Sequence, residues 1–96
     1  MKKSGANKIL YDKRVLKEDL SRLDSVMRKR VLAAIESKLT THPHIYGEPL
    51  HFELRGYWRL RAADWRIIYE ILDKNTVLIH MIGHRSDVYD QLKRRN

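Results

Sequence analysis

The chain has 96 residues, no cysteine, and 20 lysines and arginines against 12 acidic residues, which gives a formal net charge of +8. A chain of this length forms one domain that can bury a core without cross-links, and the lack of cysteine excludes disulfides, thiolate zinc sites and cysteine nucleophiles. The charge predicts attraction to RNA, DNA or an acidic protein, although a surface that only keeps the protein soluble gives the same count.

Residues 1–6 are small and basic, and we expect them to be frayed. The β-branched and aromatic residues of Lys8–Tyr11 predict a short strand. Apolar residues then recur at helical spacing over Lys13–Leu20 and again over Asp24–Thr40, where Asp24 is a candidate N-cap. Two amphipathic helices with a short joint predict an antiparallel helical hairpin.

The second half of the chain is predicted to be mainly β-structure. Two prolines and a glycine in His42–Pro49 predict a loop, and Leu50–Gly56 is expected to be turn-like. Gly83 is expected to end the last strand. Three strands and a final short helix are predicted for Tyr57–Arg61, Trp65–Leu72, Thr76–Ile82 and Val88–Arg94.

These elements predict an α/β fold of the α+β kind, formed by all of residues 1–96 as a single domain. The helical hairpin must cover one face of an antiparallel sheet, because its apolar stripes have nothing else to bury against. The other face of the sheet is then left for function. No apolar run is long enough to span a membrane and the first residues do not resemble a signal peptide, so we expect a cytoplasmic protein.

Basic and aromatic residues alternate along the first predicted strand of the hairpin. The side-chain period of two places Tyr57, Arg59 and Arg61 on one face and Trp58 on the other, where we expect the tryptophan to pack in the core. Arg66 on the next strand is expected to lie beside this group. Three guanidinium groups on one surface repel one another, so the pattern favours an anionic partner. The alternative is that they form ordinary ion pairs with Glu53, Asp64 or Glu70.

The histidines do not predict a metal site. His42 and His44 lie in the proline loop, and His80 and His84 are four residues apart, which is not a same-face spacing on a strand. No carboxylate pattern supports them as metal ligands. We expect His80 to be a packed or hydrogen-bonded strand residue.

The segment that follows the last strand contains residue types suited to phosphodiester chemistry. Cleavage of RNA needs a base for the 2′-hydroxyl proton, cations for the charge on the phosphorus oxygens, and an acid for the leaving oxygen. Arg85 suits the second role, and Tyr89 can take part in proton transfer. An equally good reading has Arg85 paired with Asp87 or Asp90 and the ring of Tyr89 filling a gap under the helix.

Four segments in this order and spacing resemble the RelE toxins of the RelE/ParE superfamily of toxin–antitoxin systems, and the resemblance covers about residues 8 to 93. The segments are Gly47–Leu50, Leu54–Arg61, Asp64–Ile71 and Gly83–Tyr89. The resemblance implies a RelE-like fold and a toxin that cuts mRNA in the ribosomal A site through attack by the 2′-hydroxyl group. It also implies that the enzyme needs no metal or cofactor.

The resemblance assigns roles to residues at matching positions. Arg59 and Arg66 match basic strand positions that act on the RNA, and Arg85 matches a phosphate-stabilising arginine. Tyr89 matches the tyrosine near the C-terminus, and these four form the expected catalytic set. Tyr57 stands where a best-studied type of the family has a lysine proposed as the base, so Arg59, His84 or a water is left to take that role. Arg61, Tyr57 and His84 form the expected substrate-binding set.

The expected partners are mRNA on the ribosome, with contacts to ribosomal RNA, and a small acidic antitoxin that covers the basic face with a helix or an edge strand. Two other functions are compatible with the same sequence. One is a ParE-like inhibitor of DNA gyrase, and the other is a degenerate toxin that retains only antitoxin binding.

Overall fold

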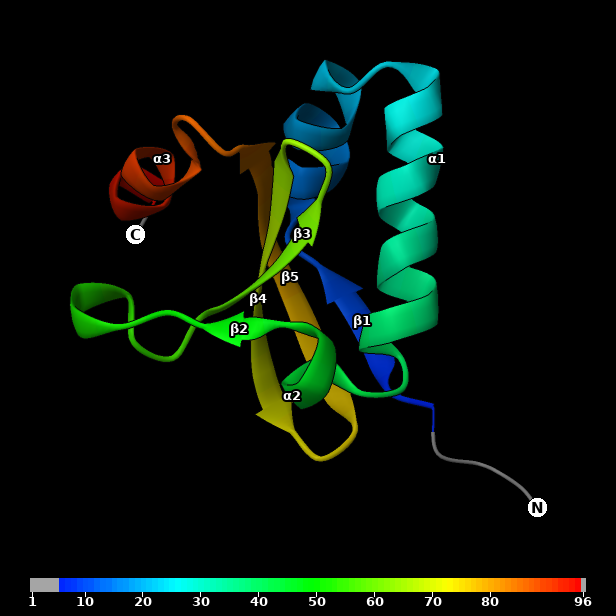
Figure 1. The fold of residues 1–96 in the computed structure, drawn as a ribbon, viewed down its shortest axis with the longest axis vertical. Helices are drawn as coiled ribbons and strands as arrows, with labels where there is room; N and C mark the ends of the chain where they lie inside the picture. The colour runs from blue at the N-terminus through cyan, green and yellow to red at the C-terminus, as the bar shows by residue number, and fades with distance from the viewer. Residues whose placement is uncertain (1–5, 96) are drawn as a thin grey trace.

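The structure is a computed structural model that describes residues 6–95. It consists of a five-stranded sheet with helices on both faces (Figure 1). The frayed segment expected for residues 1–6 lies outside the described residues, apart from Ala6. No helix within residues 6–95 is long and apolar enough to cross a membrane.

The predicted helical hairpin is present. Its first arm includes the π-helical segment η1 (Val15–Asp19) and the 3-10 turn η2 (Leu20–Arg22). The second arm is α1 (Ser25–Ala34), which continues into the π-helical segment η3 (Ile35–Leu39).

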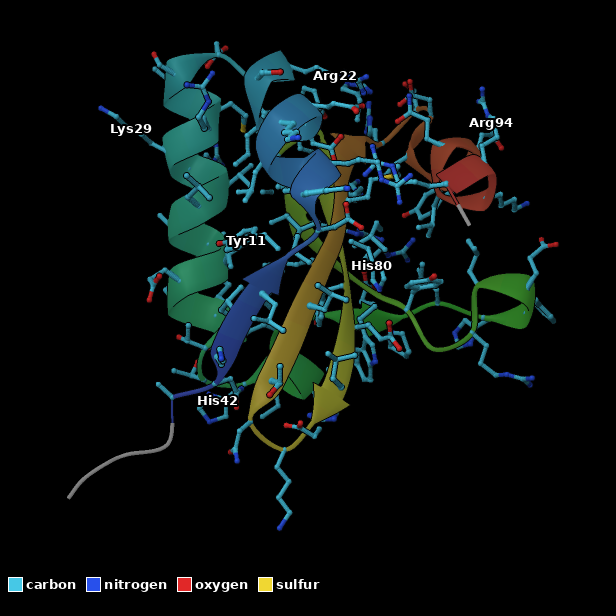
Figure 2. The ribbon with its side chains drawn as sticks, turned by 180° about the vertical axis from the view of Figure 1, so that it is seen from behind. Tyr11, Arg22, Lys29, His42, His80 and Arg94 are labelled. Carbon is cyan, nitrogen blue, oxygen red and sulfur yellow. The ribbon has the colours of Figure 1, made fainter. Side chains whose placement is uncertain are left out.

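The second arm begins at the predicted cap. The Asp24 carboxylate accepts a hydrogen bond of 2.8 Å from the backbone N–H of Met27, which satisfies one of the free donors at the start of α1. Arg28 closes the joint between the two arms by donating to the carbonyl oxygens of Leu20 and Leu23, each at 3.0 Å. Lys29 projects from the outer face of α1 (Figure 2).

The sheet has the order β1-β5-β4-β3-β2. Its strands are β1 (Lys8–Tyr11), β2 (Glu48–Pro49), β3 (Trp58–Ala62), β4 (Trp65–Asp73) and β5 (Thr76–His84). All neighbours pair antiparallel except β1, which runs parallel to β5. The predicted strands are therefore confirmed, but the sheet is mixed rather than wholly antiparallel as predicted, because β1 lies beside β5 in the parallel direction and is not joined to it by a hairpin turn.

Two segments differ from the prediction. The predicted loop at 42–49 contains the one-turn helix α2 (Pro43–Tyr46) and the edge strand β2. Proline is favoured at the start of a helix and tolerated on an edge strand, so the two prolines permit both elements. Gly83 does not end β5 but pairs with Arg66 inside it. A Cβ atom at Gly83 would lie 2.9 Å from a methyl carbon of Val88, so glycine lets the last helix approach the strand closely.

The two faces of the sheet bury separate apolar clusters. The larger one lies under the helical hairpin and includes Val31, Ile35 and Ile67, all fully buried. The smaller one lies on the opposite face, where α3 (Val88–Arg95) packs Val88 and Leu92 against the sheet. Figure 1 shows α1 and α3 on opposite sides of the sheet. The face that we expected to be left for function is therefore partly covered by α3.

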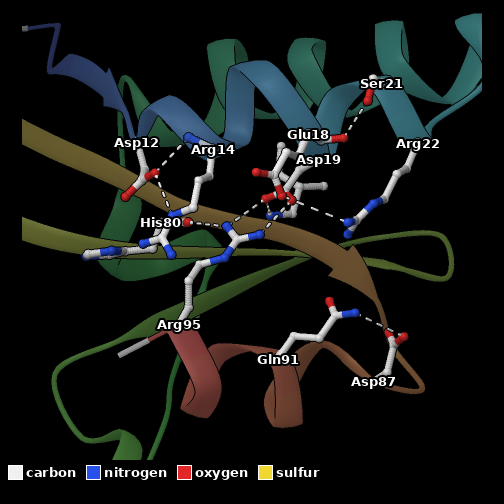
Figure 3. Close-up of polar contacts among 11 residues, drawn as sticks. Asp12, Arg14, Glu18, Asp19, Ser21, Arg22, His80, Asp87, Gln91 and Arg95 are labelled. Carbon is white, nitrogen blue, oxygen red and sulfur yellow. Dashed lines mark hydrogen bonds and ion pairs between the residues drawn. The ribbon is translucent and has the colours of Figure 1, made fainter.

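A buried ion pair fastens the end of α3 to the rest of the molecule (Figure 3). Asp19, at the end of η1, is fully buried. Its carboxylate accepts hydrogen bonds from both terminal nitrogens of Arg95, at 2.9 and 3.1 Å, and from the backbone N–H of Ile82 at 3.0 Å. Arg95 also donates to the carbonyl oxygen of His80. One carboxylate thus joins η1, β5 and α3.

Candidate functional site

The three arginines of the basic hairpin lie on one face of the sheet. Arg61 and Arg66 are directly paired across β3 and β4, and Arg59 lies two residues from Arg61 on the same face. Trp58 and Leu60 point the other way and pack in the core under the helical hairpin. The alternation read from the sequence therefore predicted both faces of this strand correctly.

Glu48 is the acidic partner of two of these arginines. It faces Arg59 across β2 and β3, and its Oε1 atom accepts a hydrogen bond of 3.0 Å from Nε of Arg59. The same oxygen lies 3.2 Å from Nε of Arg61. The hydrogen bond from Arg59, followed by the charges of the nearby arginines, lowers the pKa of the Glu48 carboxyl. An anionic ligand on this face therefore competes with an exposed carboxylate that is easily displaced.

Tyr89 reaches the same place from α3. Its hydroxyl oxygen accepts a hydrogen bond of 2.7 Å from Nη1 of Arg59, and the guanidinium carbon lies 5.9 Å from the centre of the ring. This hydrogen bond is the largest cause that raises the pKa of Arg59. The ring also packs against the smaller apolar cluster. The ring therefore fills a gap under the helix, as one reading of the sequence expects, while the hydroxyl group meets the basic face. A part for Tyr89 in proton transfer stays a prediction.

Arg59 and Tyr89 line a groove of about 530 Å³. The groove lies between α3 and the segment that follows β2. This segment contains the 3-10 turn η4 (Phe52–Leu54). The complete lining is Glu48, Pro49, Leu50, His51, Phe52, Leu54, Arg59 and Tyr89.

Arg66 and Arg85 lie at the turn between β3 and β4. Nη1 of Arg66 donates to the carbonyl oxygens of Ala63 and Trp65, at 3.0 and 2.9 Å. Nε of Arg85 lies 3.6 Å from Oδ1 of Asp64, and both of these side chains are more than half exposed. The partner of Arg85 is therefore Asp64 rather than a carboxylate of the last helix. A pair this exposed contributes little to stability, which leaves Arg85 able to bind another anion.

The structure does not bring His84 into the groove. His84 pairs with Trp65 across β4 and β5, and the two rings meet edge to face at 5.5 Å on the side of the helical hairpin. Its Nδ1 atom accepts a hydrogen bond from the backbone N–H of Ser86. Tyr57 is half-buried beside the smaller cluster, and its ring meets His80 edge to face at 5.0 Å.

The expected structural residues have structural contacts. His80 is within 2.8 Å of a carboxylate oxygen of Glu70, which confirms it as a hydrogen-bonded strand residue. Trp58 stacks on Tyr69 with ring centres 6.4 Å apart, and Trp65 packs against the larger cluster. In the part of the chain that is described, no group of three or more histidine or acidic side chains is arranged to hold a metal ion.

The sequence reasoning missed Glu48 and the apolar wall of the groove. Glu48 is part of Gly47–Leu50, a segment that already contributed to the family resemblance. The motif was therefore the signal that could have identified Glu48. The local pattern of residues indicated a loop and did not show that Glu48 pairs with a strand. The groove combines the guanidinium group of Arg59, which can bind phosphate oxygens in a fixed geometry, with a carboxylate and a phenol that can exchange protons.

Comparison with known proteins gives a consistent result. The family model described as "ParE toxin of type II toxin-antitoxin system, parDE" matches residues 9–89. Toxin RelG of Mycobacterium tuberculosis is 37% identical over 65 residues, which cover 62% of this chain and 75% of that protein. Toxin RelE of the same organism is 33% identical over 72 residues, or 74% of each chain.

Solved structures share the fold. The toxin–antitoxin complex RelBE2 from Mycobacterium tuberculosis contains a chain that superposes with a TM-score of 0.78 at 28% identity, covering 88% of this chain and 98% of that one. A free mutant of Escherichia coli toxin RelE superposes with a TM-score of 0.61 at 23% identity, over 94% and 97% of the two chains.

The fold and the matched family define a toxin component of a type II toxin–antitoxin system, and the chain belongs to the ParE toxin family. Its sequence relatives and structural neighbours are RelE-type toxins, so the resemblance read from the four segments is confirmed.

Proposed function

We propose that this toxin is a metal-independent endoribonuclease that cleaves mRNA in the A site of the ribosome and thereby inhibits translation. The observation that carries the proposal is the contact between Arg59 and Tyr89, which joins a phosphate-binding cation to a proton-carrying hydroxyl group at the wall of an open groove. The remaining arginines of the site lie on the same strands or at the adjacent turn.

In this proposal the arginines stabilise the charge that develops on the scissile phosphate. Arg59 and Arg61 exchange their ion pairs with Glu48 for the phosphate oxygens of the RNA, and Arg66 and Arg85 add positive charge from the β3–β4 turn. Removing a single donor of this kind typically lowers kcat by about 10²- to 10³-fold.

Two groups of the groove are suited to the proton transfers. Glu48 is the carboxylate among the lining residues and lies beside Arg59, so it can accept the proton of the attacking 2′-hydroxyl group once the arginines have turned to the phosphate. Tyr89 can donate a proton to the leaving 5′-oxygen, and the hydrogen bond from Arg59 holds its hydroxyl group at the groove. We therefore assign the role of base to Glu48, and we give Tyr57 and His84 no proton-transfer role.

The partners follow from charge and from the solved relatives. The net charge of +8 suits both ribosomal RNA and an acidic antitoxin. The RelBE2 chain was solved as a toxin–antitoxin complex. We propose that this chain likewise binds an acidic antitoxin over its basic face, and that it acts in the cytoplasm where translation occurs.

The test is cleavage of mRNA on purified ribosomes programmed with a defined message, followed by mapping of the new RNA ends. We expect cuts at the A-site codon, a loss of at least about 100-fold for Arg59→Ala, and clear losses for Tyr89→Phe and Glu48→Gln. Lys29→Ala is the matched control, because Lys29 lies on the outer face of α1, away from the groove.

Two other outcomes identify the alternatives. If ribosomes are untouched and purified DNA gyrase loses supercoiling activity when the toxin is added, the chain is a ParE-like gyrase inhibitor. If neither target is affected while an antitoxin still binds, the chain is a degenerate toxin. Either result refutes the ribonuclease proposal.

A further inference from the structure

An exposed aromatic side chain lines the groove and has no role in the proposed chemistry. Phe52 is 91% exposed, and it lines the same groove as Arg59 and Tyr89. Burial of a phenylalanine ring normally contributes to stability, so a ring left almost fully in water adds nothing to the fold. Its position needs another explanation.

The backbone at Phe52 is in a conformation that bulky side chains rarely adopt. Its φ angle is +58°, in the left-handed region that favours glycine. A strained residue persists only where the surrounding structure holds it, and such residues concentrate at binding and catalytic sites. The combination of strain and exposure indicates that the ring is held out for a ligand.

The loop that carries Phe52 is closed on itself and fastened to α3. The backbone N–H of Leu50 donates to the carbonyl oxygen of Tyr57 at 2.9 Å, which closes the base of the loop. At its tip, Glu53 forms an ion pair of 3.1 Å with Lys93 on α3. The closed base places Phe52 at the wall of the groove, and the exposed pair of Glu53 and Lys93 adds a weak contact with α3.

We infer that Phe52 is a base-stacking residue, which holds a nucleobase of single-stranded RNA next to the phosphate bound by Arg59. The inference rests on the proposed function and names the part of the RNA substrate, a nucleobase, that binds beside Phe52. Recognition of single-stranded RNA combines a cation for the phosphate with an aromatic ring for the unstacked base, and the groove offers these two groups. Its volume of about 530 Å³ is in the range of small-ligand sites.

A protein segment is the competing occupant, and the chemistry distinguishes it. An apolar peptide side chain gains from burial against any apolar residue of similar size, so Phe52→Leu would preserve its binding. A nucleobase needs the flat face of an aromatic ring. We therefore expect Phe52→Tyr to bind RNA like the wild type and Phe52→Leu to bind as weakly as Phe52→Ala.

The test measures binding of the purified toxin to a fluorescent single-stranded RNA of about eight nucleotides, and to an abasic backbone of the same length. Wild-type toxin should prefer the RNA that carries bases. Phe52→Ala should weaken that binding by roughly 5- to 150-fold and leave the abasic backbone unaffected. Ile45→Ala is the matched control, because Ile45 is 74% exposed on α2 and does not line the groove.

A second variant separates binding from folding. Glycine adopts the +58° conformation without strain, so Phe52→Gly should melt no lower than the wild type while it loses RNA affinity. On programmed ribosomes the same variants should raise KM for the message more than they lower kcat.

Three results overturn the inference: unchanged RNA binding by Phe52→Ala, full binding by Phe52→Leu, or equal binding of the two probes by the wild type. Failure of the proposed function has a different signature. A wild-type toxin that binds the RNA through Arg59 and Phe52 but cuts no message contradicts only the cleavage. A toxin that cuts at Arg59-dependent sites with no effect of Phe52→Ala contradicts only the stacking.

Discussion

Replacing Asp19 by alanine should be among the most damaging single changes in this protein. The carboxylate is fully buried and accepts three hydrogen bonds, two from Arg95 and one from the backbone N–H of Ile82. Asp19→Ala leaves the guanidinium of Arg95, whose side chain is only 11% exposed, without its charge partner. It also leaves the N–H of Ile82 without an acceptor.

The expected cost follows from the charge that is left behind. Removing one partner of a buried ion pair typically costs about 3–5 kcal/mol, because the remaining charge is neither solvated nor paired. A domain of this size is stable by roughly 5–15 kcal/mol, so the change removes a large share of the free energy of unfolding. Urea titration followed by circular dichroism measures this loss.

Two further variants show whether the pair itself is responsible. Asp19→Ala combined with Arg95→Met removes both charges, and it should be more stable than Asp19→Ala alone. Glu18→Ala is the matched control, because Glu18 pairs with Arg22 at 4.0 Å with both side chains more than half exposed, and its loss should cost less than about 1 kcal/mol. If Asp19→Ala costs no more than Glu18→Ala, the reasoning about this buried pair is wrong.

Three other changes test the packing around the site. Gly47→Ala should strongly destabilise the protein, because the Cβ atom of the alanine would lie 1.7 Å from the hydroxyl oxygen of Tyr69. A thermal melt of the double variant with Tyr69→Phe, which removes that oxygen, should show part of the lost stability restored. Tyr69→Phe alone should cost about 0.5–1.5 kcal/mol at neutral pH, since Tyr69 donates a hydrogen bond to the carbonyl oxygen of Pro43. Burial raises the pKa of the Tyr69 hydroxyl group, so the stabilisation by this group is fully present below the unfolded tyrosine pKa of about 10 and is lost as the pH rises above that value. The difference in the free energy of unfolding between wild type and Tyr69→Phe should therefore narrow in alkaline unfolding titrations. Asp24→Ala should lower the free energy of unfolding by about 1 kcal/mol, because it removes the acceptor for the N–H of Met27, and no loss in a urea titration would contradict the capping role.

The site was predictable where it depends on local periodicity. The period of two placed Arg59 and Arg61 on one face and Trp58 on the other, and the hairpin turn then brought Arg66 beside Arg61. These relations extend over few residues, so a sequence pattern is sufficient to predict them. Tyr89 lies farther along the chain; its residue type and its place after the last strand made it a candidate, and the family motif supported it, but no local pattern predicted its contact with Arg59.

The sequence by itself determined four of the five strands, the helical hairpin, the basic face and the family, because alternation, helical spacing and motif order are all properties of neighbouring residues. Only the tertiary structure decided that Glu48 would meet Arg59, since a two-residue edge strand is defined by its partner and not by its own residues. The same is true of Asp19 and Arg95, which are 76 positions apart in the chain. Their pairing depends on how η1, β5 and α3 pack together, and that packing fixes the helix from which Tyr89 reaches the groove.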